Sequence, residues 1–263
     1  MLLHDDRTYS VTFITRRNFV TWGRAILGGS AALSACSSGI DDGYEAVARQ
    51  VWRPGAIDGL AGAALSKELV RCATLAPSSH NTQCWKVAVV DNAITILPDL
   101  SRRTPAVDPD DHHLFVSLGC AAENLVQAAL AHGLAGEVRF DAASDAVRVT
   151  LAPTPARASR LFKAIHERQC TRGDYDGKPP SNEELRLLES AATADGMRVL
   201  LLTERSAMAQ VLDHVVRGNT AQLEDPAFVK ELKAWIRFNG TDAARTVAAS
   251  AGSSRAGVTT RGP

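Results

Sequence analysis

Two polar stretches of this chain carry side chains that could hold a small charged or aromatic ligand. The first runs from Pro77 to Trp85 and contains Ser, His, Asn, Thr and Gln in close succession. Hydroxyls, amides and backbone N–H groups of this kind suit the edge of a flat heteroaromatic ring. The same residue types favour turns, so a plain helix-to-strand loop is the competing interpretation. From composition alone the plain loop is the favoured interpretation.

The second stretch is Arg168-Gln169-Cys170-Thr171-Arg172. Two guanidinium groups with a hydroxyl beside one of them make a suitable grip for a phosphate. The competing interpretation is the solvated basic face of a helix, because Arg168 and Arg172 are four residues apart. Neither a G-x-G-x-x-G nor a Walker-type phosphate loop occurs in the sequence.

Composition excludes several classes of protein. The 263 residues balance 29 Lys and Arg against 29 Asp and Glu, so there is no electrostatic reason to expect nucleic-acid binding. The five cysteines form no C-x-x-C pair, which excludes a zinc ribbon and a thioredoxin-type dithiol. Asp108–His113 has metal-capable side chains, but a charged loop with a proline is expected to be a solvated turn, and we predict no metal site.

The first 36 residues have the pattern of an export signal. Arg16-Arg17 precedes an uncharged stretch, Ala25–Ala35, and the pair resembles a twin-arginine (Tat) signal. Leu33-Ser34-Ala35-Cys36 resembles a bacterial lipobox, whose cysteine becomes lipidated, although a soluble cleavage site nearby is an alternative. We expect passage through the Tat translocase and a periplasmic or cell-envelope location, with Cys36 anchored at the membrane surface. A chance Arg-Arg before an amphipathic helix is the other interpretation.

Helices interleaved with short hairpins predict an α+β fold. After a tether over 37–65, the first half has a helix from Ser66 to Pro77, a hairpin, a long helix and a second hairpin. The first hairpin is expected to pair residues 86–90 with 93–97. The long helix is expected at 115–134, and the second hairpin is expected to pair 137–140 with 146–152. A linker follows at 153–156.

The second half is expected to be mainly helical. Helices are predicted at 159–169, from the capping box Ser181-x-x-Glu184 to Ala194, at 206–218, and at 227–238 after an N-cap at Asp225. Met197–Thr203 is a candidate buried strand. Residues 246–263 are small, polar and without periodicity, and are expected to be disordered.

Both polar stretches match one known family. Ala76-Pro77-Ser78-Ser79-His80-Asn81-Thr82-Gln83-x-Trp85 resembles the loop Ala-Pro-Ser-x-x-Asn-x-Gln-Pro-Trp of nitroreductase-like flavoproteins, specifically the Acg family of FMN-binding oxidoreductases. Arg168–Arg172 resembles the Arg-x-x-Thr/Ser-Arg element of the same group. The segment 225–239 resembles a later helix of that family. The match runs from about Ser66 to Arg245.

The resemblance implies a nitroreductase-like fold whose two halves, 66–153 and 156–245, form a pseudo-dimer within a single-chain monomer. It implies one FMN site, with ring contacts from Ser78, Ser79, Asn81 and Gln83 in the first half and the phosphate held by Arg168, Thr171 and Arg172. The implied activity is FMN-dependent oxidoreduction between a small-molecule donor such as NAD(P)H and a nitro- or quinone-like acceptor. A flavin-holding protein without turnover, or an inactive truncated remnant, is the alternative. No catalytic residue is assigned.

The sequence departs from the family pattern at two places. Cys84 stands where the family usually has proline, which loosens the loop but removes no ligand. The resemblance fades at Arg245, where family members continue for longer. We therefore expect the second half to be incomplete or divergent.

Overall fold

The computed structural model describes residues 12–14, 46, 48–55, 59–170, 173–193 and 196–236. Arg16, Arg17, Cys36 and the segment 246–263 lie outside the described residues, so the export signal and the expected disordered tail stay predictions. The chain forms two compact units, residues 1–170 with 231–252 and residues 171–230 with 253–263. The expected halves at 66–153 and 156–245 likewise stay a prediction.

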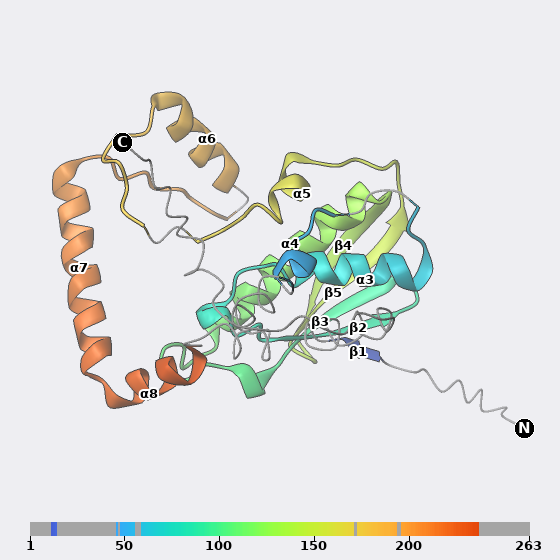
Figure 1. The fold of residues 1–263 in the computed structure, drawn as a ribbon, viewed down its shortest axis with the longest axis horizontal. Coiled ribbons are helices and arrows are strands. Elements are labelled where there is room, and N and C mark those ends of the chain that lie inside the picture. The colour runs from blue at the N-terminus through green and yellow to red at the C-terminus, as the bar shows by residue number, and fades with distance from the viewer. Residues whose placement is uncertain are drawn as a thin grey trace, which may run out of the picture. The chain divides into compact units, whose positions relative to one another are not determined.

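The first unit is built on one antiparallel sheet (Figure 1). Its strands lie in the order β1-β2-β3-β5-β4. Both predicted hairpins are present, one formed by β2 and β3 and the other by β4 and β5. Pairing of β3 with β5 joins the two hairpins into one sheet. Mixed helices and antiparallel strands confirm the α+β class. The strands are β1 Thr12–Ile14, β2 Trp85–Val90, β3 Ala93–Pro98, β4 Leu134–Asp141 and β5 Ala146–Pro153.

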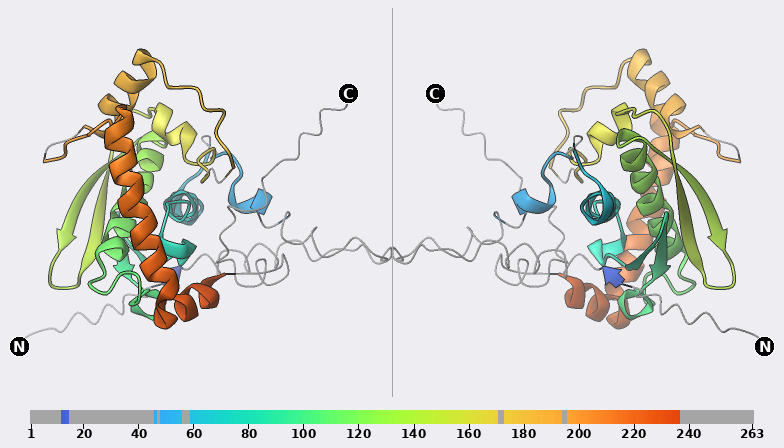
Figure 2. Two further views of the ribbon diagram at one scale, coloured as in Figure 1. Left: turned by 90° about the vertical axis from the view of Figure 1, so that its left-hand side faces the viewer. Right: turned by 90° about the vertical axis from the view of Figure 1, so that its right-hand side faces the viewer.

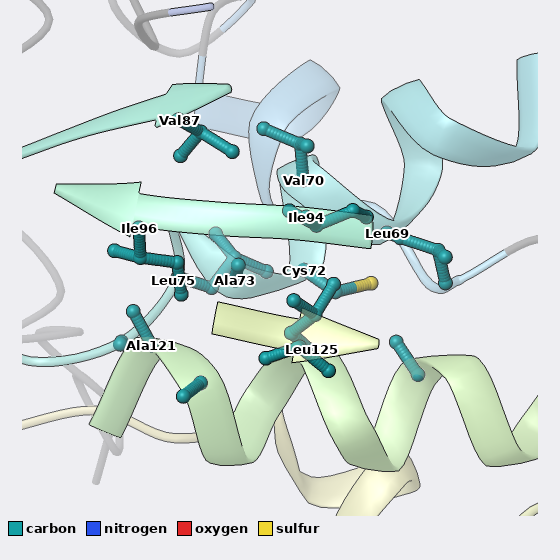
Figure 3. Packing of buried hydrophobic residues seen from close by; sticks show 14 of the residues in the cluster. Leu69, Val70, Cys72, Ala73, Leu75, Val87, Ile94, Ile96, Ala121 and Leu125 are labelled. Carbon is teal, nitrogen blue, oxygen red and sulfur yellow. The ribbon is translucent and has the colours of Figure 1, made fainter. Parts of the chain in front are cut away.

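Strand register places branched apolar side chains in rows across the sheet. Val87 lies opposite Ile96, and Ile96 lies opposite Val147 on the next strand. Because side chains directly opposite each other share a face, these residues form one buried row. Figure 3 shows Val87 and Ile96 in the core with side chains of the two long helices of this unit.

The first of these helices is α3, Gly62–Ala73. Its predicted start at Ser66 is wrong, because Ala63, Ala64 and Leu65 are good helix formers and extend the helix by one turn. The Ser66 hydroxyl donates to the Gly62 carbonyl at 3.3 Å and does not cap the helix. The inner side of this segment is apolar, since Leu69, Cys72, Ala73 and Ala76 are buried and Leu65 packs against them.

The second long helix is α4, His112–Ala131. It begins three residues earlier than predicted because the carboxylate of Asp108 accepts the backbone N–H groups of His113 and Leu114, both at 3.0 Å. Asp108 is therefore buried, not part of a solvated turn. The helix is long and apolar enough to cross a membrane by length and composition, but its inner stripe packs on α3 and the sheet, as in the core helix of a globular domain.

A short helix, α5, covers Arg160–Ala164, where a helix to Gln169 was predicted. Its start is as expected, with the Ser159 hydroxyl accepting the N–H of Phe162 at 2.9 Å. Phe162 and Ile165 are buried, but residues 167–170 are exposed and have no apolar face that would favour a longer helix. Arg168 is therefore not on the face of a helix.

The second unit contains α6, Asn182–Ala192, and α7, Arg205–Glu224, a helix of 20 residues that runs without interruption (Figure 2). The predicted capping box of α6 is present, since Ser181 and Glu184 each accept the other's backbone N–H. The predicted buried strand at 197–203 is wrong. Met197 and Leu200 are 61% and 69% exposed. Met197 forms an isolated β-bridge, but the described part of this unit contains no strand that would extend it into a ladder.

The last described helix is α8, Pro226–Trp235. Asp225 accepts the N–H of Ala227 at 2.8 Å, as its predicted capping role requires. The described residues from Glu231 to Ile236 belong to the first unit. This assignment is important because Glu231 and Trp235 contact the region around the polar loop that follows α3.

Candidate functional site

The loop between α3 and β2 has an unusual backbone. It contains a turn of 3₁₀ helix, η1, at Ser79–Asn81. His80, Asn81 and Gln83 all have positive φ, at 47°, 53° and 53°. Left-handed backbone is uncommon for residues other than glycine, and such clusters are often found at ligand-binding sites. The strain favours a binding loop over a plain connection.

Hydrogen bonds within the loop bring the four expected ring contacts into one turn. The N–H of Gln83 donates to the Ser78 hydroxyl at 2.9 Å, and the N–H of Asn81 donates to the Ser78 carbonyl at 2.9 Å. Ser78, Ser79 and Asn81 are half-buried, whereas Gln83 is buried. The side chains of Ser78, Ser79 and Asn81 are thus partly exposed, and Gln83 closes the turn through its backbone N–H.

Each end of the loop is held by an arginine that lies on a tryptophan ring. Upstream, Arg168 donates to the Leu75 carbonyl at 3.4 Å, and its guanidinium carbon is 5.6 Å from the Trp52 ring centroid. Downstream, the Nε of Arg102 donates to the Thr82 carbonyl. Arg102 is part of η2, a 3₁₀ turn at Leu100–Arg102, and its guanidinium lies 5.4 Å from the Trp235 ring centroid. Cation–π contacts of this kind restrict flexible side chains.

The end of α8 braces the same region. The Glu231 carboxylate accepts the backbone N–H groups of Ala106 and Val107 at 3.0 and 3.3 Å. It also interacts electrostatically with His80, whose buried Nε2 has no hydrogen-bond partner among the described residues. Burial lowers the pKa of His80, against the opposing effect of Glu231. Burial therefore favours the uncharged form of His80, and one of its ring nitrogens is left unsatisfied by the described part of the chain.

Of the expected phosphate ligands, the structure places Arg168 beside the loop. Its Leu75 contact is three residues upstream of Ser78, and its Nη1 lies 3.9 Å from the Sγ of Cys170. No carboxylate pairs with Arg168 among the described residues. Thr171 and Arg172 lie outside the described residues. Arg168 is an exposed cation that is oriented but not neutralised.

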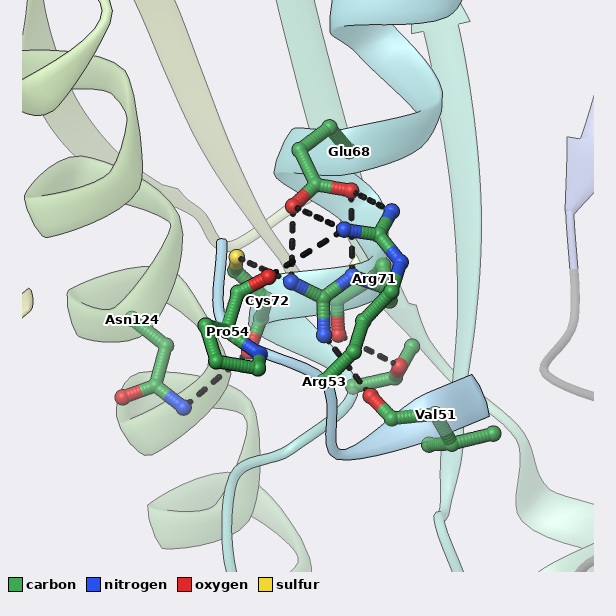
Figure 4. A network of polar contacts seen from close by, with 8 residues as sticks. Val51, Arg53, Pro54, Glu68, Arg71, Cys72 and Asn124 are labelled. Carbon is green, nitrogen blue, oxygen red and sulfur yellow. Dashed lines mark hydrogen bonds and ion pairs between the residues drawn. The ribbon is translucent and has the colours of Figure 1, made fainter. Parts of the chain in front are cut away.

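A buried ion cluster fixes the segment that carries Trp52 (Figure 4). Glu68 accepts from Arg71 at 2.7 Å and pairs with Arg53, and Arg71 also donates to the Val51 carbonyl at 2.7 Å. Burial alone would raise the pKa of Glu68, but the two arginines hold it below its usual range. Residues 48–55, expected to be part of a tether, are thus bound to the core.

Sequence inspection missed the residues that orient the site. Trp52 and Arg102 belong to no motif. Glu231 and Trp235 lie in the segment 225–239 that resembles a later helix of the family, but the resemblance gave them no role at the site. Up to 125 positions separate the bonded partners along the chain. The one available signal was polar residues on the buried side of α3, where Glu68 and Arg71 interrupt the apolar pattern. Two unlike charges three residues apart on a helix are expected to pair.

Two of the four cysteines in the described part of the chain are small buried hydrophobes. Cys72 and Cys84 are buried free thiols, whereas Cys120 is half-buried and Cys170 is exposed. Burial raises the pKa of Cys72 to about 11, so it is an unreactive thiol. Cys84, which occupies the proline position of the family loop, also packs inside, and burial raises its pKa.

The donors gathered here fit a ligand with an anionic end and a polar aromatic ring. Arg168 provides an unpaired cation at one end of the loop. Half-buried hydroxyl and amide groups lie along it, and the unsatisfied Nε2 of His80 lies within it. FMN, with a phosphate and a heteroaromatic ring, has this combination of groups.

Two curated relatives resemble the chain. They come from Mycobacterium tuberculosis strains H37Rv and CDC 1551, and each is 27% identical over 198 residues. Both are named "Putative NAD(P)H nitroreductase". The match covers 68% of this chain and 56% of each relative, so the chain spans little more than half of their length. No family model matches the chain. The relatives support a nitroreductase-like family, and the mixed helical and antiparallel fold is consistent with it.

Proposed function

We propose that the chain is an FMN-dependent, nitroreductase-like oxidoreductase. The observation that carries this proposal is the strained loop at 78–83, with Arg168, which pairs with no carboxylate in the described part of the chain, in contact with its base at Leu75. Ligand-binding loops tolerate such strain because the surrounding structure enforces it. The names of the two relatives supply the reaction class.

In this proposal Arg168, Thr171 and Arg172 hold the phosphate, and Ser78, Ser79, Asn81 and Gln83 face the edge of the ring. FMN, when bound, supplies two-electron transfer between a donor such as NAD(P)H and a nitro- or quinone-like acceptor. The protein's part is to bind and orient. Arg168 and Arg172 would provide bidentate donors, and the Asn81 amide would donate near the ring, where such donors favour the reduced form.

His80 would contribute a neutral ring nitrogen to the same loop. Burial keeps its pKa low, so the imidazole stays uncharged near neutral pH and can exchange hydrogen bonds without adding a cation. Glu231 holds the backbone at 106–107 and faces His80. The loop, η2 and the end of α8 would together fix the polar groups before the ligand arrives, which reduces the ordering cost of binding.

The proposal also includes a cellular location and a domain arrangement, both of which rest on the sequence alone. The protein would pass the Tat translocase by means of Arg16-Arg17 and remain on the cell envelope through lipidated Cys36. It would act as a monomer whose two halves form an internal pseudo-dimer of the Acg type.

Absorbance and reduction of the purified full-length protein test the function. We expect flavin bands after gentle purification and their bleaching when NADH or NADPH is added without oxygen. Flavin bands that no donor bleaches would favour the alternative of a flavin-holding protein. Absence of flavin, with no uptake of added FMN, would contradict the proposal and favour an inactive remnant.

A further inference from the structure

Arg168 is held in place without the use of a carboxylate from the described part of the chain. Its guanidinium rests on the Trp52 ring at 5.6 Å, and its polar contacts with the Leu75 carbonyl at 3.4 Å and the Cys170 sulfur at 3.9 Å are long and weak. An aromatic face attracts a cation through its quadrupole and occupies no N–H donor. Most of the hydrogen-bonding capacity of Arg168 therefore remains for an anion.

Trp52 is itself fixed from both sides. Its backbone N–H donates to the Ala48 carbonyl at 2.8 Å, and the preceding Val51 is 1% exposed, with its carbonyl bound by Arg71. On the other side Arg53 pairs with Glu68 (Figure 4). The indole ring is thus a firmly placed platform and not a chance neighbour of a mobile arginine.

We propose that Trp52 is a positioning residue for the phosphate grip, holding the Arg168 guanidinium where it meets the phosphate of FMN. This inference rests on the proposed FMN site. It extends that site to a residue outside both polar stretches, in a segment that the sequence pattern assigned to a tether. The ring acts through Arg168, so its effect is confined to ligands that carry the phosphate.

The test compares FMN with riboflavin, which has the same ring and no phosphate. Dissociation constants are measured by flavin fluorescence for the wild type and for Trp52→Ala, Trp52→Phe and Arg168→Ala. We expect Trp52→Ala to weaken FMN binding about two- to thirty-fold, the range of a cation–π contact, and to leave riboflavin binding unchanged. Trp52→Phe keeps an aromatic face and should recover most of the loss.

Two further variants serve as controls for this comparison. Trp52→Ala in an Arg168→Ala background should cause no additional loss of FMN affinity, because the ring would have no cation left to position. Phe140→Ala removes another aromatic ring, 58% exposed on β4, and should leave both affinities at the wild-type value. Melting temperatures of all variants report whether the fold is intact.

Three results would overturn the positioning role of Trp52, and each identifies a different cause. If the wild type binds FMN and Trp52→Ala binds it equally well, the positioning role is overturned. If Trp52→Ala weakens FMN and riboflavin alike, Trp52 supports the fold only, and the inference is also overturned. If the wild type binds neither ligand, the proposed FMN site fails and this inference fails with it.

Discussion

The Nη2 of Arg71 donates to the Glu68 carboxylate at 2.7 Å, and neither side chain is more than 2% exposed. With Arg53 nearby, one buried carboxylate serves two guanidinium groups (Figure 4). The cluster joins α3 to the segment at Val51, next to the Trp52 ring on which Arg168 rests. Core stability and the orientation of the candidate phosphate ligand therefore depend on the same carboxylate.

Glu68→Gln should be strongly destabilising. The substitution keeps the shape of the side chain but leaves the buried Arg71 without a counter-charge. Breaking one partner of a buried ion pair costs roughly 3 to 5 kcal/mol. Urea unfolding followed by circular dichroism measures the loss.

Glu137→Gln is the matched control. Glu137 pairs with Arg139 on β4, with side chains 62% and 77% exposed, and an exposed pair contributes at most about 1 kcal/mol. Similar small losses in both variants would show that the Glu68 cluster does not hold the fold together.

Acidification should lower the free energy of unfolding from about pH 7 downward. His80, His132 and His166 each have a pKa lowered by burial, so the unfolded chain, where histidine titrates near its ordinary 6.5, binds more protons than the folded chain. The stability these residues provide is complete above that value and is lost as the pH falls. Urea midpoints between about pH 8 and pH 5 measure the slope.

The charges that face these histidines differ. Glu231 faces His80 and Glu68 faces His132, while His166 meets Arg71, Glu68 and Glu167. Replacing His132 and His166 with Asn should flatten the slope, whereas His112→Gln, at an exposed position, should leave it as in the wild type. A midpoint that rises on acidification would refute the burial argument.

Glu231→Ala should loosen the chain between η2 and α4. Two backbone N–H groups, at Ala106 and Val107, would lose a charged acceptor, and hydrogen bonds to charged groups contribute roughly 1.5 to 3 kcal/mol each. Amide hydrogen exchange at these positions should accelerate at least about ten-fold. Glu224→Ala on the exposed surface of α7 should not change it. Equal amide hydrogen exchange at Ala106 and Val107 in the two variants would contradict the stabilising role of Glu231.

The export prediction is tested by fractionation of expressing cells. Replacing Arg16 and Arg17 with Lys should leave unprocessed precursor in the cytoplasm, and Cys36→Ser should give a product without lipid. Wild-type protein found soluble in the cytoplasm would show that the predicted export signal is wrong.

Local signals in the sequence predicted the elements that local chemistry decides. The predicted hairpin of 86–90 with 93–97 is present, with the two-residue turn Asp91-Asn92 between its strands, and Ser181 with Glu184 indicated the start of α6. The apolar run 197–203 did not become a strand, because strand formation depends on a pairing partner elsewhere in the chain.

For the site, motif resemblance identified the loop and the arginine element but not what orients them. Arg102 on Trp235 and Arg168 on Trp52 are contacts between distant segments. Neither pair has a spacing that a sequence pattern can detect. Similarly, Asp108 was predicted to lie in a solvated turn. In the structure its carboxylate accepts backbone N–H groups from the first turn of α4.

FMN titration tests the central claim most directly. The wild type is compared with a double variant, Arg168→Ala with Arg172→Ala, in the same buffer and with fluorescence as the readout. Each charged contact to the phosphate is expected to contribute roughly 1.5 to 3 kcal/mol, so the double variant should bind at least about a hundred-fold more weakly. Equal FMN affinity in the two proteins would contradict the account.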